Sequence, residues 1–222
     1  MFPQLRALLD HPAPLLFTGA ALLHILLNGF GLAEWLGGGG FISGIAGLVK
    51  IASILLALFV MMYHGFAISD STSISFWNTG LMPISSLAYS ALGGMVLSLN
   101  LNPAAGAEGT RYLPPAHSAS LVLVVAAFII VLALLQGAKR GSPGAKKSLF
   151  LLTRDGPYVK WFYGLVIGAG FVVPFLLLAL LPESRIVSFL VALAVLSGYY
   201  TFRVLVFKVG LYDPIISFAP ES

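Results

Sequence analysis

The chain contains no cysteine. It therefore cannot form a disulfide, and it has no thiolate with which to bind a metal ion or an iron–sulfur cluster. Any redox centre that is bound through thiolates must belong to a partner protein. A second scarcity, that of charge, limits the class of protein further.

Charged residues make up only 9% of the 222 residues, whereas 59% are hydrophobic and the mean hydropathy is +0.97. Soluble domains carry about 25% charged residues, so this composition excludes an ordinary soluble domain and indicates an integral membrane protein. The net charge of +4 does not indicate nucleic-acid binding, because the basic residues are spread over loops beside apolar segments. We expect no cleavable signal peptide, since the first apolar segment is too long and no small-residue cleavage site follows it.

Long apolar runs are the main feature of the chain. A membrane-spanning helix needs about 20 predominantly apolar residues. Six segments meet this requirement, at roughly 14–35, 43–66, 78–100, 119–137, 161–181 and 186–207. The runs are continuously apolar rather than alternating, which favours helices over a β-barrel. We therefore predict an all-α fold, a polytopic transmembrane helical bundle of about six spans that forms a single domain over residues 1–222.

The distribution of Lys and Arg predicts the orientation in the membrane. We call the side with the N-terminus side A; with six spans it also holds the loops near 67–77 and 138–160 and the C-terminus. Side B then holds three of the twelve basic residues and side A the other nine, mostly in the 138–160 loop. Because basic residues are enriched in cytoplasmic loops, we expect side A and both termini to be cytoplasmic. We interpret the basic run 139–147 as a solvated loop facing lipid headgroups, with docking of a partner as the alternative.

Three local patterns refine this topology. Gly164 and Gly168 are four residues apart in the fifth span, which predicts close helix packing. Pro174 in the same span predicts a kink. The run Arg154–Pro157 predicts a turn before that helix.

Polar and aromatic residues concentrate in the stretch 63–100, where two apolar spans meet. We expect several of these side chains to lie together at the side A boundary, at the level of Tyr199 and Arg203 of the last span. They are Tyr63, His64, Asp70, Trp77 and Asn78. Belts of Trp and Tyr and extended Arg side chains are usual at the ends of membrane helices. That explanation does not account for a His, an Asp, an Asn and an Arg together, and the second hypothesis is a site that binds a quinone headgroup and transfers its protons.

The first span carries two further polar residues, His24 and Asn28, which share a helix face because they are four residues apart. They are either a hydrogen-bonded pair between helices or a proton relay or polar contact for a lipid-soluble ligand. A haem held by two histidines is not expected. His24 lies about 15 Å from side A at 1.5 Å per residue, whereas His64 lies near the side A end of its helix, so the two differ in depth.

Several motifs, found from the second predicted span through the sixth, resemble those of one family. Tyr63-His64-Gly65-Phe66, then the run 76–83 (Phe-Trp-Asn-Thr-Gly-Leu-Met-Pro) and the run 90–94 (Ser-Ala-Leu-Gly-Gly) resemble the signature of the NrfD/PsrC family. The run 161–168 with Pro174 is similar to a later helix of that family, and Gly198 to Gly210 with Arg203 is similar to its closing helix. The resemblance covers about 60–222. Family members usually have eight or more spans, whereas we count six here.

The resemblance implies a haem-free membrane anchor subunit of a respiratory oxidoreductase in a prokaryotic inner membrane. Such a subunit binds menaquinone or ubiquinone and exchanges electrons with an iron–sulfur partner subunit, which connects it to a molybdopterin catalytic subunit. Proton transfer is then expected at His64, Asp70 and His24. Quinone contacts are expected at Tyr63, Trp77, Asn78, Asn28, Tyr89 and Arg203. The alternatives are a small secondary transporter or channel, which predicts a midplane site on broken helices, and a purely structural membrane anchor.

Overall fold

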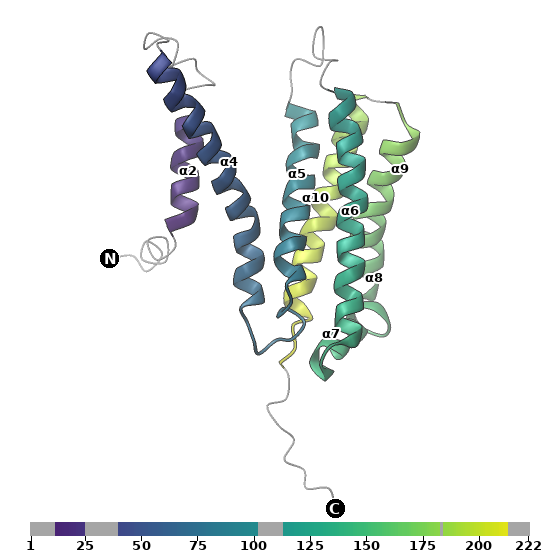
Figure 1. Cartoon of the computed structure of the whole chain (residues 1–222). Coiled ribbons are helices and arrows are strands. Elements are labelled where there is room, and N and C mark those ends of the chain that lie inside the picture. The colour runs from purple at the N-terminus through teal and green to yellow at the C-terminus, as the bar shows by residue number, and fades with distance from the viewer. Residues whose placement is uncertain (1–11, 25–39, 102–112, 183, 213–222) are drawn as a thin grey trace, which may run out of the picture. The chain divides into compact units, whose positions relative to one another are not determined.

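A computed structural model describes residues 12–24, 40–101, 113–182 and 184–212 of the chain (Figure 1). The chain divides into two compact units, Met1–His64 and Gly65–Ser222, and the boundary falls inside the long helix α4 (Gly40–Ser69). The described regular elements of both units are helices.

The first unit contains α2 (Pro12–His24) and most of α4. A polar contact joins the two helices: the Ser53 hydroxyl of α4 lies 3.0 Å from the carbonyl oxygen of Ala20 in α2 and 2.8 Å from that of Val49 in its own helix. Ser53 is buried. A hydroxyl bonded to the backbone of a neighbouring helix is one of the contacts that hold helices together in an apolar environment.

The second unit is a bundle built from the rest of the chain. Figure 1 shows α5, α6, α10 and the stacked elements α8, η4 and α9 side by side, with the short α7 at the lower end of α6. The elements are α5 (Leu81–Leu101), α6 (Leu113–Arg140), α7 (Pro143–Thr153), α8 (Val159–Trp161), the π-helix η4 (Phe162–Val172), α9 (Val173–Leu180) and α10 (Arg185–Lys208). Their inward faces form one apolar core whose largest fully buried members include Leu92, Val131, Phe162, Val166 and Val195. This core holds the ends of α5 and α10 in fixed positions.

The predicted fold class is confirmed. Within the described residues, five helical stretches are long and apolar enough to cross a membrane: 44–69, 81–100, 116–140, 159–180 and 185–208. They correspond to the second to sixth predicted spans. The first predicted span, 14–35, begins in α2, and its part beyond His24 lies outside the described residues.

The basic segment 138–160, predicted as a loop, contains a helix instead. Helix α6 continues to Arg140, and α7 follows after two residues. The Ser142 side chain accepts a hydrogen bond from the backbone N–H of Ala145 at 3.3 Å, and Pro143 occupies the first turn, where no backbone donor is needed. One face of α7 is buried and contains Gly144, Ala145, Ser148 and Leu152. The prediction of a loop is wrong because the many Lys and Gly residues of this segment are typical of loops, although part of it forms a short amphipathic helix. The predicted turn at Arg154–Pro157 is confirmed.

The predicted close packing at Gly164 and Gly168 is wrong. A Cβ atom on Gly164 would meet nothing within 4 Å, and one on Gly168 would meet only the Tyr163 oxygen of its own helix. The close approach lies at Gly170, whose backbone contacts that of Gly198 in α10. The segment is a π-helix, whose hydrogen bonds span five residues, so a four-residue spacing no longer marks one face. The π pattern ends at Val172, and Pro174 lies in the first turn of α9.

Candidate functional site

A polar cluster inside the second unit centres on Arg203 of α10. Its Nε donates a hydrogen bond to the Tyr199 hydroxyl at 2.9 Å, and its Nη2 donates one to the Ser86 hydroxyl of α5 at 2.7 Å. The guanidinium carbon also lies 5.2 Å from the centre of the Tyr199 ring. Tyr199 and Arg203 are four residues apart and so share a face of α10. The cluster therefore joins α5 and α10 through a charge-assisted hydrogen bond.

Arg203 has N–H groups that Tyr199 and Ser86 do not use. A guanidinium has five N–H groups, and two of them are used by Tyr199 and Ser86. No carboxylate of the described residues forms an ion pair with it, and Ser86 is only 2% exposed. A positive charge that is hydrogen-bonded only to neutral hydroxyls inside a helix bundle is suited to bind a carbonyl or anionic oxygen of a ligand.

Tyr89 lies one helical turn after Ser86 on α5, and its side chain is 3% exposed. Its ring stacks on those of Tyr199 and Phe202, with centroids 4.8 and 5.3 Å away, and contacts Phe171 at 5.7 Å. Its buried hydroxyl has no hydrogen-bond partner among the described residues. Leaving such a group unpaired costs about 1–3 kcal/mol. The Tyr89 hydroxyl is thus a second polar group suited to a ligand oxygen.

The cluster lies one to two helical turns inside one end of the second unit. Arg203 is five residues from the last residue of α10, about 7.5 Å along the axis, and Tyr89 is eight residues from the first of α5, about 12 Å. Figure 1 places these two helix ends at the same end of the second unit. On the predicted topology this is the side A end.

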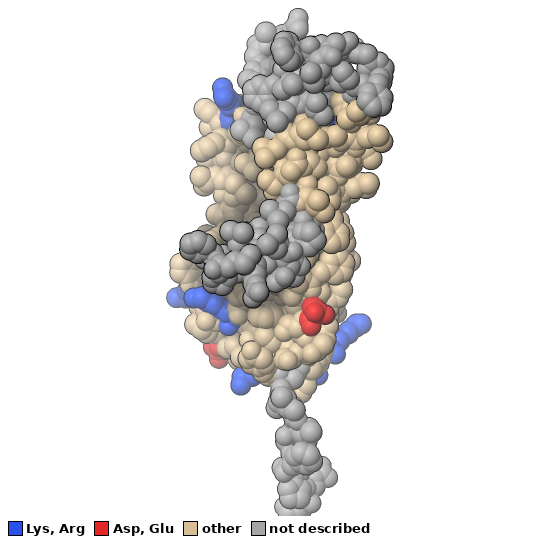
Figure 2. All heavy atoms as spheres, turned by 90° about the vertical axis from the view of Figure 1, so that its left-hand side faces the viewer, with Lys and Arg blue, Asp and Glu red and all other residues tan. Residues whose placement is uncertain are grey.

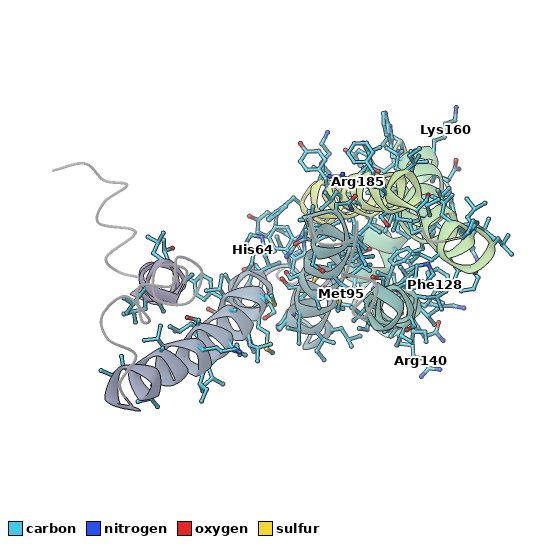
Figure 3. The ribbon with its side chains drawn as sticks, turned by 90° about the horizontal axis from the view of Figure 1, so that it is seen from above. His64, Met95, Phe128, Arg140, Lys160 and Arg185 are labelled. Atoms are coloured by element: carbon cyan, nitrogen blue, oxygen red, sulfur yellow. The ribbon has the colours of Figure 1, made fainter. Side chains whose placement is uncertain are left out.

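An apolar groove adjoins the cluster on the α6 side. It has a volume of about 270 Å³ and lies between α6 and the η4–α9 helix, where it is lined by Val124, Val125, Phe128, Phe171, Val172, Phe175 and Leu176. Phe171 contacts Phe128 (Figure 3) at 5.3 Å between ring centroids and also contacts Tyr89. Ring contacts therefore run from the groove through Phe171 and Tyr89 to the tyrosine that holds Arg203.

Trp77 fixes the segment between α4 and α5 to the end of α10. Its indole N–H donates to the Val206 carbonyl oxygen at 2.9 Å, and its ring packs edge-on against Phe207 with centroids 5.5 Å apart. A Cβ atom on Gly210 would come within 3.0 Å of the Trp77 Nε1, so this ring lies directly on the backbone that follows α10. With its N–H used in this way, Trp77 holds the end of α10 in place.

The structure places the other predicted residues as follows. Tyr63 and His64 lie in the part of α4 that ends the first unit; His64 is exposed, and the Tyr63 ring lies 6.2 Å from that of Phe59. Asp70 and Asn78 are exposed in the irregular segment between α4 and α5 of the second unit. His24 is the last residue of α2, and Asn28 lies outside the described residues. Of the predicted quinone contacts, the structure brings Tyr89 and Arg203 into one cluster.

The prediction of site residues missed Ser86, Phe128 and Phe171. A signal was available for Ser86, because it precedes Tyr89 by three residues and therefore shares its helix face. No group of three or more His, Cys, Asp or Glu residues within the described ranges is arranged to hold a metal ion.

Comparison with known proteins gives one match. The model of a family described as polysulphide reductase, NrfD, matches residues 23–212. No curated protein and no solved structure matches the chain significantly. The matched range includes both α4 and the complete helical part of the second unit, and with it every residue of the Arg203 cluster.

Proposed function

Because the chain belongs to the polysulphide reductase NrfD family, we propose that it is the quinone-interacting membrane subunit of a reductase complex of this type. The family match over residues 23–212 is the observation that carries the proposal. In a complex of this kind, an iron–sulfur subunit would exchange electrons with the quinone site and a molybdopterin subunit would carry the catalytic centre. The chain has no cysteine of its own, which agrees with this division of roles.

We place the quinone headgroup at the Arg203 cluster. A quinone carbonyl oxygen accepts hydrogen bonds, and Arg203 has N–H groups that Tyr199 and Ser86 do not use. The buried Tyr89 hydroxyl can donate to such an oxygen or accept from the hydroxyl of a quinol. The residues present therefore fit the polar end of a quinone. The stacked rings of Tyr89 and Tyr199 supply a flat apolar surface beside it.

The groove between α6 and α9 suits the isoprenoid tail. Its lining is apolar throughout, and Phe171 belongs both to its wall and to the ring contacts of Tyr89. A hydrocarbon chain in this groove would remain in the membrane interior while the headgroup is held nearer to side A.

Oxidation of a bound quinol releases two electrons and two protons. We propose that the electrons leave to the partner subunit and that His64 and Asp70, with His24 in the first span, accept and pass protons on side A. An imidazole and a carboxylate are the usual groups for this purpose. Both His64 and Asp70 are exposed, and they lie at or near the end of α4 that faces side A on the predicted topology. The positive-inside bias supports a cytoplasmic location of side A and of both termini in a prokaryotic inner membrane.

Replacement of these proton-accepting groups tests this part of the proposal. We expect His64→Ala and Asp70→Ala each to lower quinol-coupled turnover of the complex at least tenfold, because general acid–base groups typically contribute about 10²–10⁴-fold. Turnover with an artificial dye that reduces the catalytic subunit directly is expected to stay unchanged. The measurement is the ratio of the two rates in purified membranes.

Asp155→Ala is the matched control, since Asp155 is an exposed aspartate in the turn before α8. It is expected to leave the ratio at the wild-type value. If both His64→Ala and Asp70→Ala kept full quinol-coupled turnover, the assignment of proton transfer to these residues would be wrong.

A further inference from the structure

A second groove lies further along α6, toward the end of the helix at Arg140. It is formed by α6 and by Leu149 of α7 and has a volume of about 520 Å³. Its lining consists of Ile129, Leu132, Ala133, Leu135, Gln136, Lys139 and Leu149. Six of these residues come from α6 and five of the seven are aliphatic. The groove therefore follows one strip of the membrane-spanning helix down to its last turn.

The polarity of this strip changes in one direction. Ile129, Leu132, Gln136 and Lys139 follow one another at helical spacing on one face, over about 15 Å at 1.5 Å per residue. Hydrocarbon comes first, then an amide, and then an ammonium group at the end of the helix. A glycerophospholipid has the same order: acyl chains, then ester carbonyls, then a phosphate.

The chain segment that forms the end of the groove carries charge of one sign. The chain has no acidic residue between Glu108 and Asp155, whereas Lys and Arg occur five times from 139 to 154. On α7, Lys146 precedes Leu149 by one turn on the same helix face. Figure 3 shows Arg140 projecting outward from α6, and in Figure 2 several basic side chains lie in the lower half of the view, with acidic side chains among them. An anion at the end of the groove would meet Lys139, and residues 109–154 contribute further cations and no carboxylate.

We propose that this groove binds an anionic glycerophospholipid of the side A leaflet. One acyl chain lies along Ile129, Leu132 and Ala133, and the Gln136 amide donates to an ester carbonyl. The phosphate is held by Lys139 with Lys146 beside it. The amphipathic α7, which packs its small residues on the bundle, closes the groove with Leu149. The site is separate from the proposed quinone site, because it lies further along α6 toward Arg140 and shares no lining residue with the first groove.

A lipid explains this lining better than the acidic surface of a partner protein. Most of the lining is aliphatic and belongs to a helix that is long and apolar enough to cross the membrane. A partner that docks through charge alone would use the cations at the rim and leave the aliphatic strip unused. A phospholipid satisfies both parts of the groove.

The test measures lipid binding to the full chain, with any subunits that purify with it, after removal of lipid in detergent. Phosphatidylglycerol and phosphatidylcholine with identical acyl chains are titrated separately, and bound lipid is counted by native mass spectrometry. We expect tighter binding of phosphatidylglycerol. A basic residue near an anionic lipid surface is worth about fivefold in affinity, so Lys139→Gln with Lys146→Gln should weaken its binding by about 20-fold or more.

Two further variants separate a specific site from general attraction of charge. Lys147→Gln removes the same charge from the same helix, but Lys147 is two residues from Leu149 and does not share its helix face, so we expect less than a twofold change. Ala133→Phe fills the aliphatic part without changing any charge, and we expect it to displace the lipid. Equal affinity for the two lipids would overturn the proposal, as would equal effects of Lys139→Gln and Lys147→Gln. Loss of a partner subunit from the Lys139→Gln protein with unchanged lipid binding would also overturn it.

Discussion

Replacing Arg203 by glutamine is expected to lower the quinol-coupled turnover of the complex by about 10²–10³-fold. The guanidinium is the one positive charge of the cluster, and its hydrogen bonds to a ligand oxygen are charge-assisted. Removing a single preorganised donor to a developing charge costs about this much in other enzymes. The measurement is the rate with a quinol divided by the rate with a dye that bypasses this subunit.

Two controls distinguish a binding role from a structural one. Arg203→Lys keeps the positive charge but loses the fork that reaches both Tyr199 and Ser86, and we expect an intermediate rate with a raised KM for quinol. Ser86→Ala removes only the α5 partner, and we expect a smaller loss than for Arg203→Gln. If Arg203→Gln lowered the amount of folded complex and the dye rate in parallel, the residue would be structural and the assignment of the headgroup would fail.

A larger side chain at Gly198 is expected to have the largest effect on stability. The backbones of Gly198 and Gly170 are in contact, and a Cβ atom on Gly198 would lie 2.9 Å from the Gly170 nitrogen. Neither backbone can move without separating α10 from η4. Overpacking of this kind costs about 1–3 kcal/mol where side chains can adjust, and here backbone must move, so Gly198→Leu should lower the free energy of unfolding by about 3 kcal/mol or more.

The measurement is unfolding of the purified protein in mixed micelles with increasing denaturing detergent. Gly164→Ala is the control, because a Cβ atom there meets nothing within 4 Å, and we expect a change of about 0.5 kcal/mol or less. Equal effects of Gly198→Leu and Gly164→Ala would show that the close contact with Gly170 does not support the bundle.

The spanning helices were predictable because membrane insertion sets a strong condition on composition. Predicted ends such as 186–207 and 161–181 differ by only one or two residues from α10 and from the helix 159–180. Two features were not predictable in the same way. Helix α7 depends on a Ser cap and small residues that pack on the bundle, and the π-helix depends on tertiary packing. Because residues four apart do not share one face of a π-helix, the close glycine contact lies at Gly170 and not at Gly164 and Gly168.

The candidate site was predictable in part. The predicted depth of the last span indicates that Arg203 and Tyr199 lie near side A, and the family resemblance implies Tyr89 as a quinone contact. Their contact could not be derived, because it depends on how α5 rotates relative to α10. Ser86 was missed because a serine in a membrane helix commonly bonds to its own backbone. Trp77 is predicted to contact the ligand, and its indole N–H donates to the Val206 carbonyl oxygen at the end of α10.

The most direct test of the central claim is binding of a short-tailed quinone analogue to the purified complex. Quenching of the intrinsic protein fluorescence during the titration gives the dissociation constant. Binding of a radiolabelled analogue gives the number of sites. We predict one saturable site in the wild-type protein, with affinity at least tenfold weaker in Arg203→Gln and clearly weaker in Tyr89→Phe. Absence of saturable binding in the wild-type complex, or identical binding in all three proteins, would contradict a quinone site at this cluster.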